Sequence, residues 1–151
     1  MKLLPIALVL ALAPAASPAA EVTPIAVSAD VGQPLSALIE AMRRRDVAAL
    51  DKALARSVEP QIVYYWGETV TGREPILQWH REWFAEAGWS IEPGPTTHAL
   101  AGDRLATITS SMRYVKSAER QFVILVNYTL LKEAEGWKVA RIQQTLLEGP
   151  D

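Results

Sequence analysis

The chain has 151 residues, with 15 lysines and arginines against 17 aspartates and glutamates, and it has no cysteine. The missing cysteines exclude disulfides and thiolate metal sites. A formal net charge of −2, with no basic run beyond Arg43-Arg44-Arg45, argues against nucleic-acid binding. A chain of this length can bury one core without cross-links.

The N-terminus has the order of a secretory signal peptide. Lys2 gives a positive start, the apolar run Leu3–Ala13 follows, and small residues and prolines come next. An apolar run of about 11 residues is too short to cross a bilayer of roughly 30 Å, which disfavours a retained anchor. The sequence predicts a signal peptide over 1–19, cut after Ala19 or alternatively after Ala15. We therefore expect a periplasmic or secreted protein without membrane contact after cleavage.

Helical periodicity follows a predicted N-terminal tail at residues 20–33. Pro34 suits the first turn of a helix, and apolar residues recur after it at helical spacing as far as the arginine run at 43–45. Asp46 is a good N-cap for a second helix that ends before Pro60. The sequence thus predicts two consecutive helices at the start of the domain.

The rest of the chain is rich in β-branched and aromatic residues separated by short polar turns. Pro93-Gly94-Pro95 indicates that one strand is interrupted or bulged. Long strands joined by short turns pair antiparallel. The expected elements are a strand over 62–66, a hairpin over 67–72, a helix over 73–87, and strands over 89–100, 104–115, 121–131 and 137–147.

This element order resembles the nuclear transport factor 2-like fold, in its SnoaL-like form. The segments that carry the resemblance are Leu38–Ala49, Gly67–Ile76, Ala101–Ala106 and Gly136–Val139. It covers about residues 34–147 and places one SnoaL-like domain over 34–151. It implies an α+β roll, also described as cystatin-like, in which a curved antiparallel or mixed sheet forms a cone closed by three N-terminal helices.

The resemblance leaves the chemistry open, because the family includes enzymes, ligand-binding domains and assembly domains. Its enzymes use a carboxylate or a histidine–carboxylate pair in the pocket, but the last predicted strand here reads Ala140–Thr145, without an acid or a histidine. His80, on the helix face of Ile76 and Trp83, is the remaining candidate for a catalytic base. The alternative is a pocket-lining or core histidine. His98 is expected at the surface.

Aromatic residues point more clearly to a binding pocket. Ligand pockets are mostly apolar and aromatic, with a few converging polar groups. Core packing explains most of these rings, but tyrosine and tryptophan also border cavities with their polar ends. A buried amide either bonds across the sheet or faces a ligand or water. The predicted pocket residues are Tyr64, Trp66, Trp83, Tyr114, Asn127 and Gln144.

Three functions therefore stay open. The first is an exported protein that binds a small hydrophobic molecule in an aromatic pocket. The second is a cofactor-independent lyase, isomerase or hydrolase acting on a small hydrophobic carbonyl compound, with His80 as base and Tyr114 or Asn127 polarising an oxygen. The third is an assembly module whose sheet mainly forms a homodimer. We expect no metal and no cofactor, and we expect a homodimer because strand 121–131 is apolar on both faces.

Overall fold

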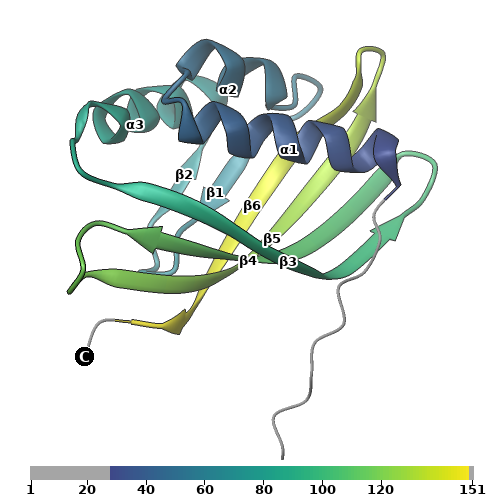
Figure 1. Ribbon diagram of the computed structural model, residues 1–151. Coiled ribbons are helices and arrows are strands. Elements are labelled where there is room, and N and C mark those ends of the chain that lie inside the picture. The colour runs from purple at the N-terminus through teal and green to yellow at the C-terminus, as the bar shows by residue number, and fades with distance from the viewer. Residues whose placement is uncertain (1–27, 150–151) are drawn as a thin grey trace, which may run out of the picture.

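The computed structural model describes residues 28–149, except for the side chain of His98, so the predicted signal peptide at 1–19 lies outside it. Three helices lie against one six-stranded sheet (Figure 1). This confirms the predicted α+β class with three helices. The elements are α1 (Ala29–Arg43), α2 (Val47–Ala53), β1 (Gln61–Val63), β2 (Thr69–Thr71), α3 (Arg73–Ala85), β3 (Ser90–Ala101), β4 (Leu105–Val115), β5 (Gln121–Glu133) and β6 (Gly136–Glu148).

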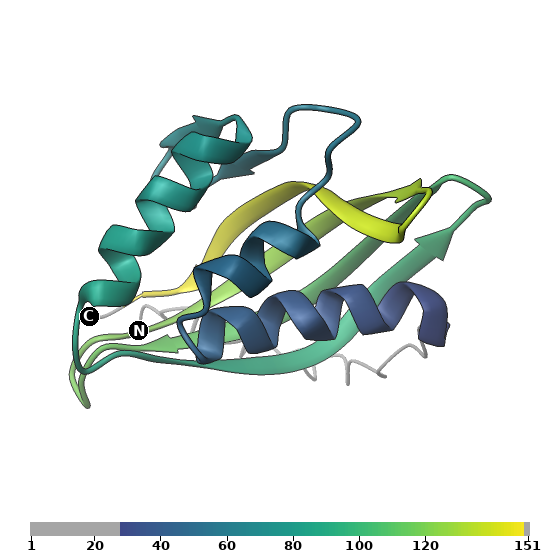
Figure 2. The same ribbon diagram turned by 90° about the horizontal axis from the view of Figure 1, so that it is seen from above.

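The sheet is mixed, curved and unclosed. Its strand order is β2-β1-β6-β5-β4-β3, and every pair is antiparallel except β1 with β6. The register shifts twice along β3–β4 and twice along β5–β6. Such bulges bend the strands that carry them. Figure 2 shows the resulting curve, with the three helices on its concave side.

The predicted interrupted strand is one bulged strand, β3. Its pairing with β4 slips between Pro93 and Thr96 and again between Thr96 and His98. Gly94 lies within the first slip, where a Cβ atom would crowd both the side chain and the backbone of Ser111. A glycine therefore permits the close approach of the two strands.

The first helix begins at Ala29, five residues before the predicted start at Pro34. The last part of the predicted tail is therefore helical, and Val31 is buried in the core. The Ser28 carbonyl accepts the first helical hydrogen bonds, and the Asp30 carboxylate accepts one from the Trp137 indole at 3.3 Å. These contacts with the rest of the domain stabilise the helical turn that precedes Pro34, so the helix starts before its proline. The third helix also differs from expectation, because it ends at Ala85 rather than at residue 87.

Side chains at the helix ends fix α2 between its neighbours. The predicted N-cap is confirmed, because Asp46 accepts a hydrogen bond from the Ala49 amide at 2.9 Å. Farther along, both carboxylate oxygens of Asp51 accept hydrogen bonds from the guanidinium of Arg73, the first residue of α3. These bonds keep the pKa of Asp51 below its usual value. They tie α2 to the start of the helix that carries His80.

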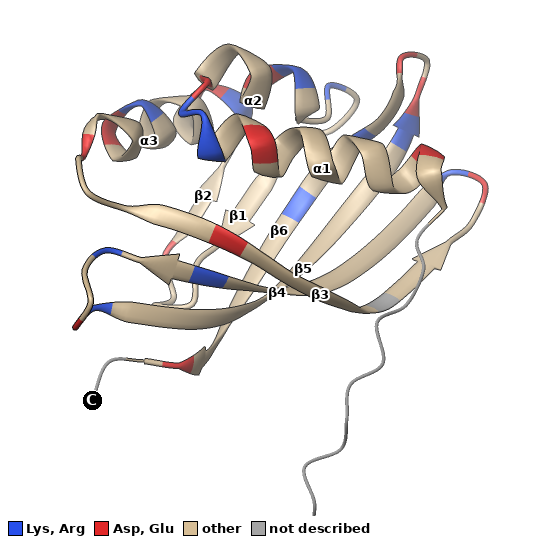
Figure 3. Cartoon of the chain, viewed as in Figure 1, with Lys and Arg blue, Asp and Glu red and all other residues tan. Residues whose placement is uncertain are grey.

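The core lies between the helices and the concave side of the sheet. Charged residues gather on the helices and turns and are sparse along the strands (Figure 3). No helix among residues 28–149 is long and apolar enough to span a membrane. The largest fully buried side chains are Tyr128, Leu38, Leu50, Leu54, Ile76, Ile108, Leu130, Val31, Val126 and Val139.

Candidate functional site

A cavity of about 250 Å³ lies between α3 and the concave side of the sheet. Most of its lining is apolar. Met42 at the end of α1 contributes to the wall, and Ile62, Ile124 and Ile142 contribute from three strands of the sheet. A second, more open hollow of about 640 Å³ lies near the start of α1 and the β5–β6 turn, and charged residues such as Lys132 and Glu135 line it. The first hollow is the one that contains the predicted pocket residues.

Strand register explains which side chains form the deep part of the cavity. Tyr128 on β5 pairs with Ile142 on β6, and Ile142 pairs with Ile62 on β1, so these three form one row across the sheet. Side chains two residues apart along a strand share a face. Gln144, two residues beyond Ile142, therefore faces the cavity as well, and so does Tyr64, two residues beyond Ile62.

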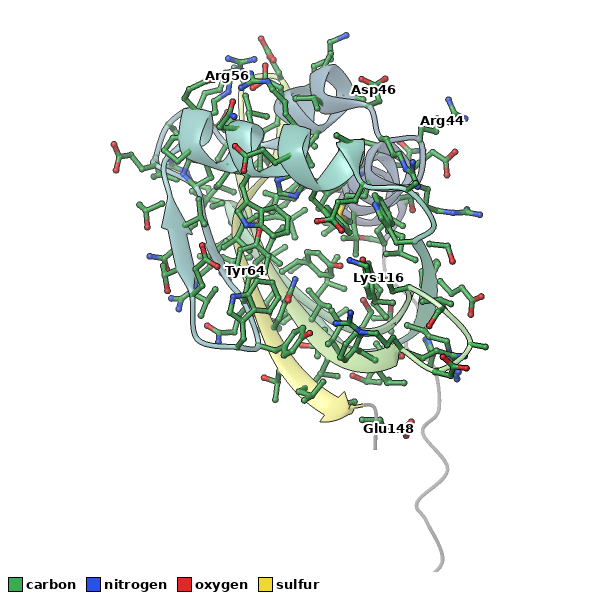
Figure 4. The ribbon with its side chains drawn as sticks, turned by 90° about the vertical axis from the view of Figure 1, so that its left-hand side faces the viewer. Arg44, Asp46, Arg56, Tyr64, Lys116 and Glu148 are labelled. Atoms are coloured by element: carbon green, nitrogen blue, oxygen red, sulfur yellow. The ribbon has the colours of Figure 1, made fainter. Side chains whose placement is uncertain are left out.

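Seven aromatic side chains surround the cavity in a closed chain of ring contacts, which we call the aromatic collar. Consecutive ring centroids lie between 4.4 and 6.1 Å apart. Pairs at this range stabilise each other beyond simple burial. Figure 4 views this end of the molecule, with Tyr64 on the side of β1 and β2 and Lys116 at the β4–β5 turn. In order, the collar consists of Tyr64, Trp66, Tyr65, Phe122, Tyr114, Trp83 and Trp79.

Two tyrosine hydroxyls in the cavity wall are buried without a hydrogen-bond partner among the described residues. They belong to Tyr64 and Tyr128, whose side chains are 4% and 1% exposed. Burial raises the pKa of both phenols. The nearby Glu68 carboxylate adds to the shift at Tyr64, whereas the neighbouring Ser110 hydroxyl opposes the shift at Tyr128. Both groups therefore stay protonated at neutral pH and act as donors. A buried donor without a partner costs about 1–3 kcal/mol.

His80 is a neutral side chain of the cavity wall. Its Nδ1 lies 2.7 Å from the Ile76 carbonyl oxygen, which can only accept, so Nδ1 carries the proton and Nε2 is left as an acceptor. Burial lowers the pKa of His80 to about 4, although the bond to Ile76 acts in the opposite direction. The imidazole packs edge-on against Trp79, Trp83 and Phe84. It is therefore uncharged at neutral pH.

The structure brings most of the predicted site residues together. His80, Tyr64, Trp66, Trp83, Tyr114 and Gln144 all line the cavity. Asn127 does not, because it lies on the opposite face of β5 and donates a hydrogen bond to the Thr109 hydroxyl at 2.8 Å. It is therefore not a pocket residue. The side chain of His98 lies outside the described part of the chain.

Fourteen of the lining residues were not among those predicted from the sequence, and eight of the fourteen, Tyr128 among them, are buried in the core. Helical spacing from Ile76 and Trp83 would have identified Trp79, but Tyr65 lies in a turn and Phe122 at a strand end, where no periodicity points to a face. Charged residues at the mouth had no recognisable signal in the sequence. The six unpredicted lining residues that are not fully buried are Tyr65, Trp79, Phe122, Glu86, Lys116 and Arg120.

The mouth of the cavity has a salt bridge and an additional cation. Oε2 of Glu86, just after α3, lies 2.8 Å from Nζ of Lys116, just after β4. This hydrogen bond and the charge of Glu86 raise the pKa of Lys116. Arg120, at the other end of the same turn, lines the cavity too. The mouth thus has two cations and one anion around an uncharged interior.

Comparison with known proteins supports the fold. The family model of the SnoaL-like domain matches residues 31–146. A candidate calcium/calmodulin-dependent protein kinase type II association domain from Thiobacillus denitrificans has a TM-score of 0.67 at 16% identity, covering 78% of this chain and 94% of that one. No curated protein matches the sequence.

Two further solved structures have candidate enzymatic functions. A candidate dehydratase of the NTF2-like family from Streptomyces avermitilis has a TM-score of 0.66 at 19% identity, covering 80% of this chain and 95% of that one. A candidate ketosteroid isomerase from Shewanella frigidimarina also has a TM-score of 0.66, at 20% identity, covering 78% and 96%. Similarity at this level of identity establishes the shared fold alone.

Proposed function

The chain belongs to the SnoaL-like domain family, and we propose that it is an exported protein that binds a small hydrophobic molecule carrying a hydrogen-bond acceptor. The single observation that carries this proposal is the pair of unpartnered hydroxyls, of Tyr64 and Tyr128, in the wall of a mostly apolar cavity. Export rests on the signal peptide predicted from the sequence.

The two hydroxyls define what the bound molecule must offer. Both remain protonated, because burial raises their pKa values, so each has an O–H group that an acceptor on the bound molecule would satisfy. None of the described side chains of the interior is charged, and burying an ion there without a partner would be costly. A neutral acceptor such as a ketone, ester or amide oxygen therefore suits this end of the cavity.

The volume and walls of the cavity limit the size and shape of the ligand. About 250 Å³ lies just below the usual range for small-molecule pockets, roughly 300–1,000 Å³. The collar presents ring faces and edges, which favour flat apolar groups. A molecule of one or two rings fits these limits best.

An enzyme of the lyase, isomerase or hydrolase kind is less well supported. The candidate dehydratase and isomerase with this fold make it a real alternative. A general base works best when its pKa is near the working pH, but burial lowers that of His80 to about 4. No carboxylate among residues 28–149 bonds to the imidazole. In a binding protein, His80→Gln should change affinity only modestly, whereas loss of turnover on the order of 100-fold with binding intact would identify an enzyme.

The proposal can be tested by calorimetric titration with two matched probes. 2-Acetylnaphthalene has a carbonyl oxygen, and 2-ethylnaphthalene has the same ring and nearly the same size without it. The ketone should bind more tightly to the wild-type protein by about fivefold to tenfold, the worth of one hydrogen bond. Tyr128→Phe and Tyr64→Phe together should abolish this difference and leave binding of the hydrocarbon unchanged.

Tyr65→Phe is the control, because this collar tyrosine is only half-buried and its hydroxyl is not one of the two buried groups. The ratio of the dissociation constants of the two probes should be the same in this variant as in the wild-type protein. Equal binding of ketone and hydrocarbon to the wild-type protein would contradict the proposed acceptor, and failure of both probes to bind would contradict the proposed cavity ligand.

A further inference from the structure

The cavity has a sharp change of charge between its interior and its mouth. Inside, His80 is neutral and both buried tyrosines are protonated. The charged members of the lining are Glu86, Lys116 and Arg120. All three come from the segment just after α3 and from the β4–β5 turn, so an ionised group on a ligand would meet partners only there.

Arg120 is the cation of the mouth that has no partner. Lys116 is already paired with Glu86 at 2.8 Å, whereas the guanidinium of Arg120 forms no salt bridge or hydrogen bond with any described residue. Glu119, next to it in the turn, does not line the cavity. The mouth therefore has one uncompensated positive charge.

The backbone of the β4–β5 turn holds Arg120 in place. The Lys116 amide donates to the Arg120 carbonyl oxygen at 2.9 Å, and the Arg120 amide donates to the Ser117 hydroxyl at 3.2 Å. Burial raises the pKa of the Tyr65 hydroxyl, and the positive charge of Arg120 opposes that shift. The charge of Arg120 is therefore felt at the collar.

From this arrangement we propose that the ligand is an amphipathic acid whose apolar body lies inside the aromatic collar and whose anionic group stays at the mouth, paired with Arg120. This inference rests on the proposed function and adds the charge and orientation of the ligand. A guanidinium pairs well with a carboxylate because its planar N–H groups match the two oxygens. The uncharged interior excludes the reverse orientation, because a carboxylate there would have no counter-charge.

Glu86 limits how strongly the mouth attracts an anion. It lies 2.8 Å from Lys116 and compensates that charge. A ligand carboxylate near Lys116 would have to compete with it and would be repelled by it. Removing the charge with Glu86→Gln should therefore strengthen the binding of acids.

Two probes of the same shape test the inference at pH 7.5. 2-Naphthoate and 2-acetylnaphthalene share a ring system and have nearly the same size, but only the first is charged. Arg120→Gln should weaken the binding of 2-naphthoate about fivefold, as expected for a partly exposed ion pair, and leave the affinity for the ketone unchanged. Glu86→Gln should tighten 2-naphthoate by a similar factor. Raising NaCl should weaken only the acid.

Arg113→Gln is the matched control, because it removes the same charge from a nearby exposed residue that bonds to Gln121 and does not line the cavity. It should leave 2-naphthoate binding unchanged. If Arg120→Gln leaves the acid unaffected, or weakens acid and ketone equally, the inference is wrong while the proposed function stands. If the ketone itself fails to bind, the proposed function is wrong as well.

Discussion

The rings of Tyr65 and Phe122 lie 5.8 Å apart, centroid to centroid, and their contact joins the β1–β2 turn to the start of β5. The strand between them in the sheet is β6, so the two side chains meet across it on the concave side. The contact closes the aromatic collar at the side of the mouth opposite α3. One pair of rings thus determines whether the cavity has a continuous aromatic wall.

Opening the collar at Phe122 should weaken ligand binding while the protein stays folded. Phe122→Ala removes the contacts with Tyr65 and Tyr114, each worth about 0.5–1.5 kcal/mol in aromatic pairs. We expect calorimetry to show roughly tenfold weaker binding of 2-acetylnaphthalene. Val123→Ala, the next residue of the same strand but on the opposite face, should leave the affinity unchanged. An equal loss in both variants would contradict a role for the collar.

Removing a buried hydroxyl should not destabilise the free protein. Tyr128→Phe deletes a donor that has no partner among the described residues, so it also deletes the cost of burying that donor. The free energy of unfolding in urea should stay the same or rise by about 1 kcal/mol, and Tyr64→Phe should behave similarly. A loss of more than about 1 kcal/mol would show that the hydroxyl is already bonded in the free protein.

Stability should fall in mild acid because His80 resists protonation in the folded state. Burial lowers the pKa of His80 to about 4 from the ordinary 6.5, so between these values the unfolded chain binds a proton that the folded chain refuses. The contribution of His80 is therefore complete above pH 6.5 and is lost as the pH falls toward 4. Urea unfolding should show a loss of about 2 kcal/mol between pH 7 and pH 5 from this side chain.

The variant His80→Gln isolates this effect from other titrating groups. Glutamine cannot gain a proton. The free energy of unfolding of the variant should therefore lose less than that of the wild-type protein between pH 7 and pH 5, and the difference should equal the contribution of His80. Asp51 and Glu133, whose hydrogen bonds lower their pKa values, titrate mainly below this range in both proteins. Parallel curves for variant and wild type would show that the imidazole is solvated rather than buried.

The sequence predicted the positions of the helices and strands better than it predicted which of their side chains face the core. Period-two alternation fails in β5, where apolar residues occupy both sides, so the sequence could not tell that Val126 and Tyr128 face inward and Asn127 outward. Register with β6 and β1 decides this, and register depends on pairing between strands that are distant in the sequence. Asn127 was accordingly placed in the pocket although it bonds to Thr109 across the outer face.

The charged mouth of the cavity was beyond sequence reasoning for a different reason. Glu86 and Lys116 are thirty residues apart in the sequence. Each lies in a polar segment that resembles an ordinary solvent-exposed turn. Their proximity follows from the curvature of β3 and β4, which brings the β4–β5 turn back toward the end of α3. The early start of α1 at Ala29 has a similar origin, since the contact between Asp30 and Trp137 joins opposite ends of the domain sequence.

Export predicts a shortened N-terminus. The apolar run at 3–13 and the small residues before position 20 match the pattern that signal peptidase recognises. Mass spectrometry of protein from the periplasm or medium should find a chain that starts at Ala20, or alternatively at Ala16. Ala19→Arg, which places a large charged residue directly before the main cut, should shift or block processing. An intact Met1 on the wild-type protein would rule out cleavage.

A homodimer is the arrangement we propose for the outer face of the sheet. The helices cover the concave face, but Leu125 lies on the other side of β5, and Leu105 and Leu147 are 50% and 52% exposed. The two exposed leucines lie near opposite ends of β5, so the proposal rests on this strand, because a strand that is apolar on both faces needs both covered. Light scattering should give twice the chain mass, and Leu125→Glu should give a folded monomer. A wild-type monomer at high concentration would contradict the proposal.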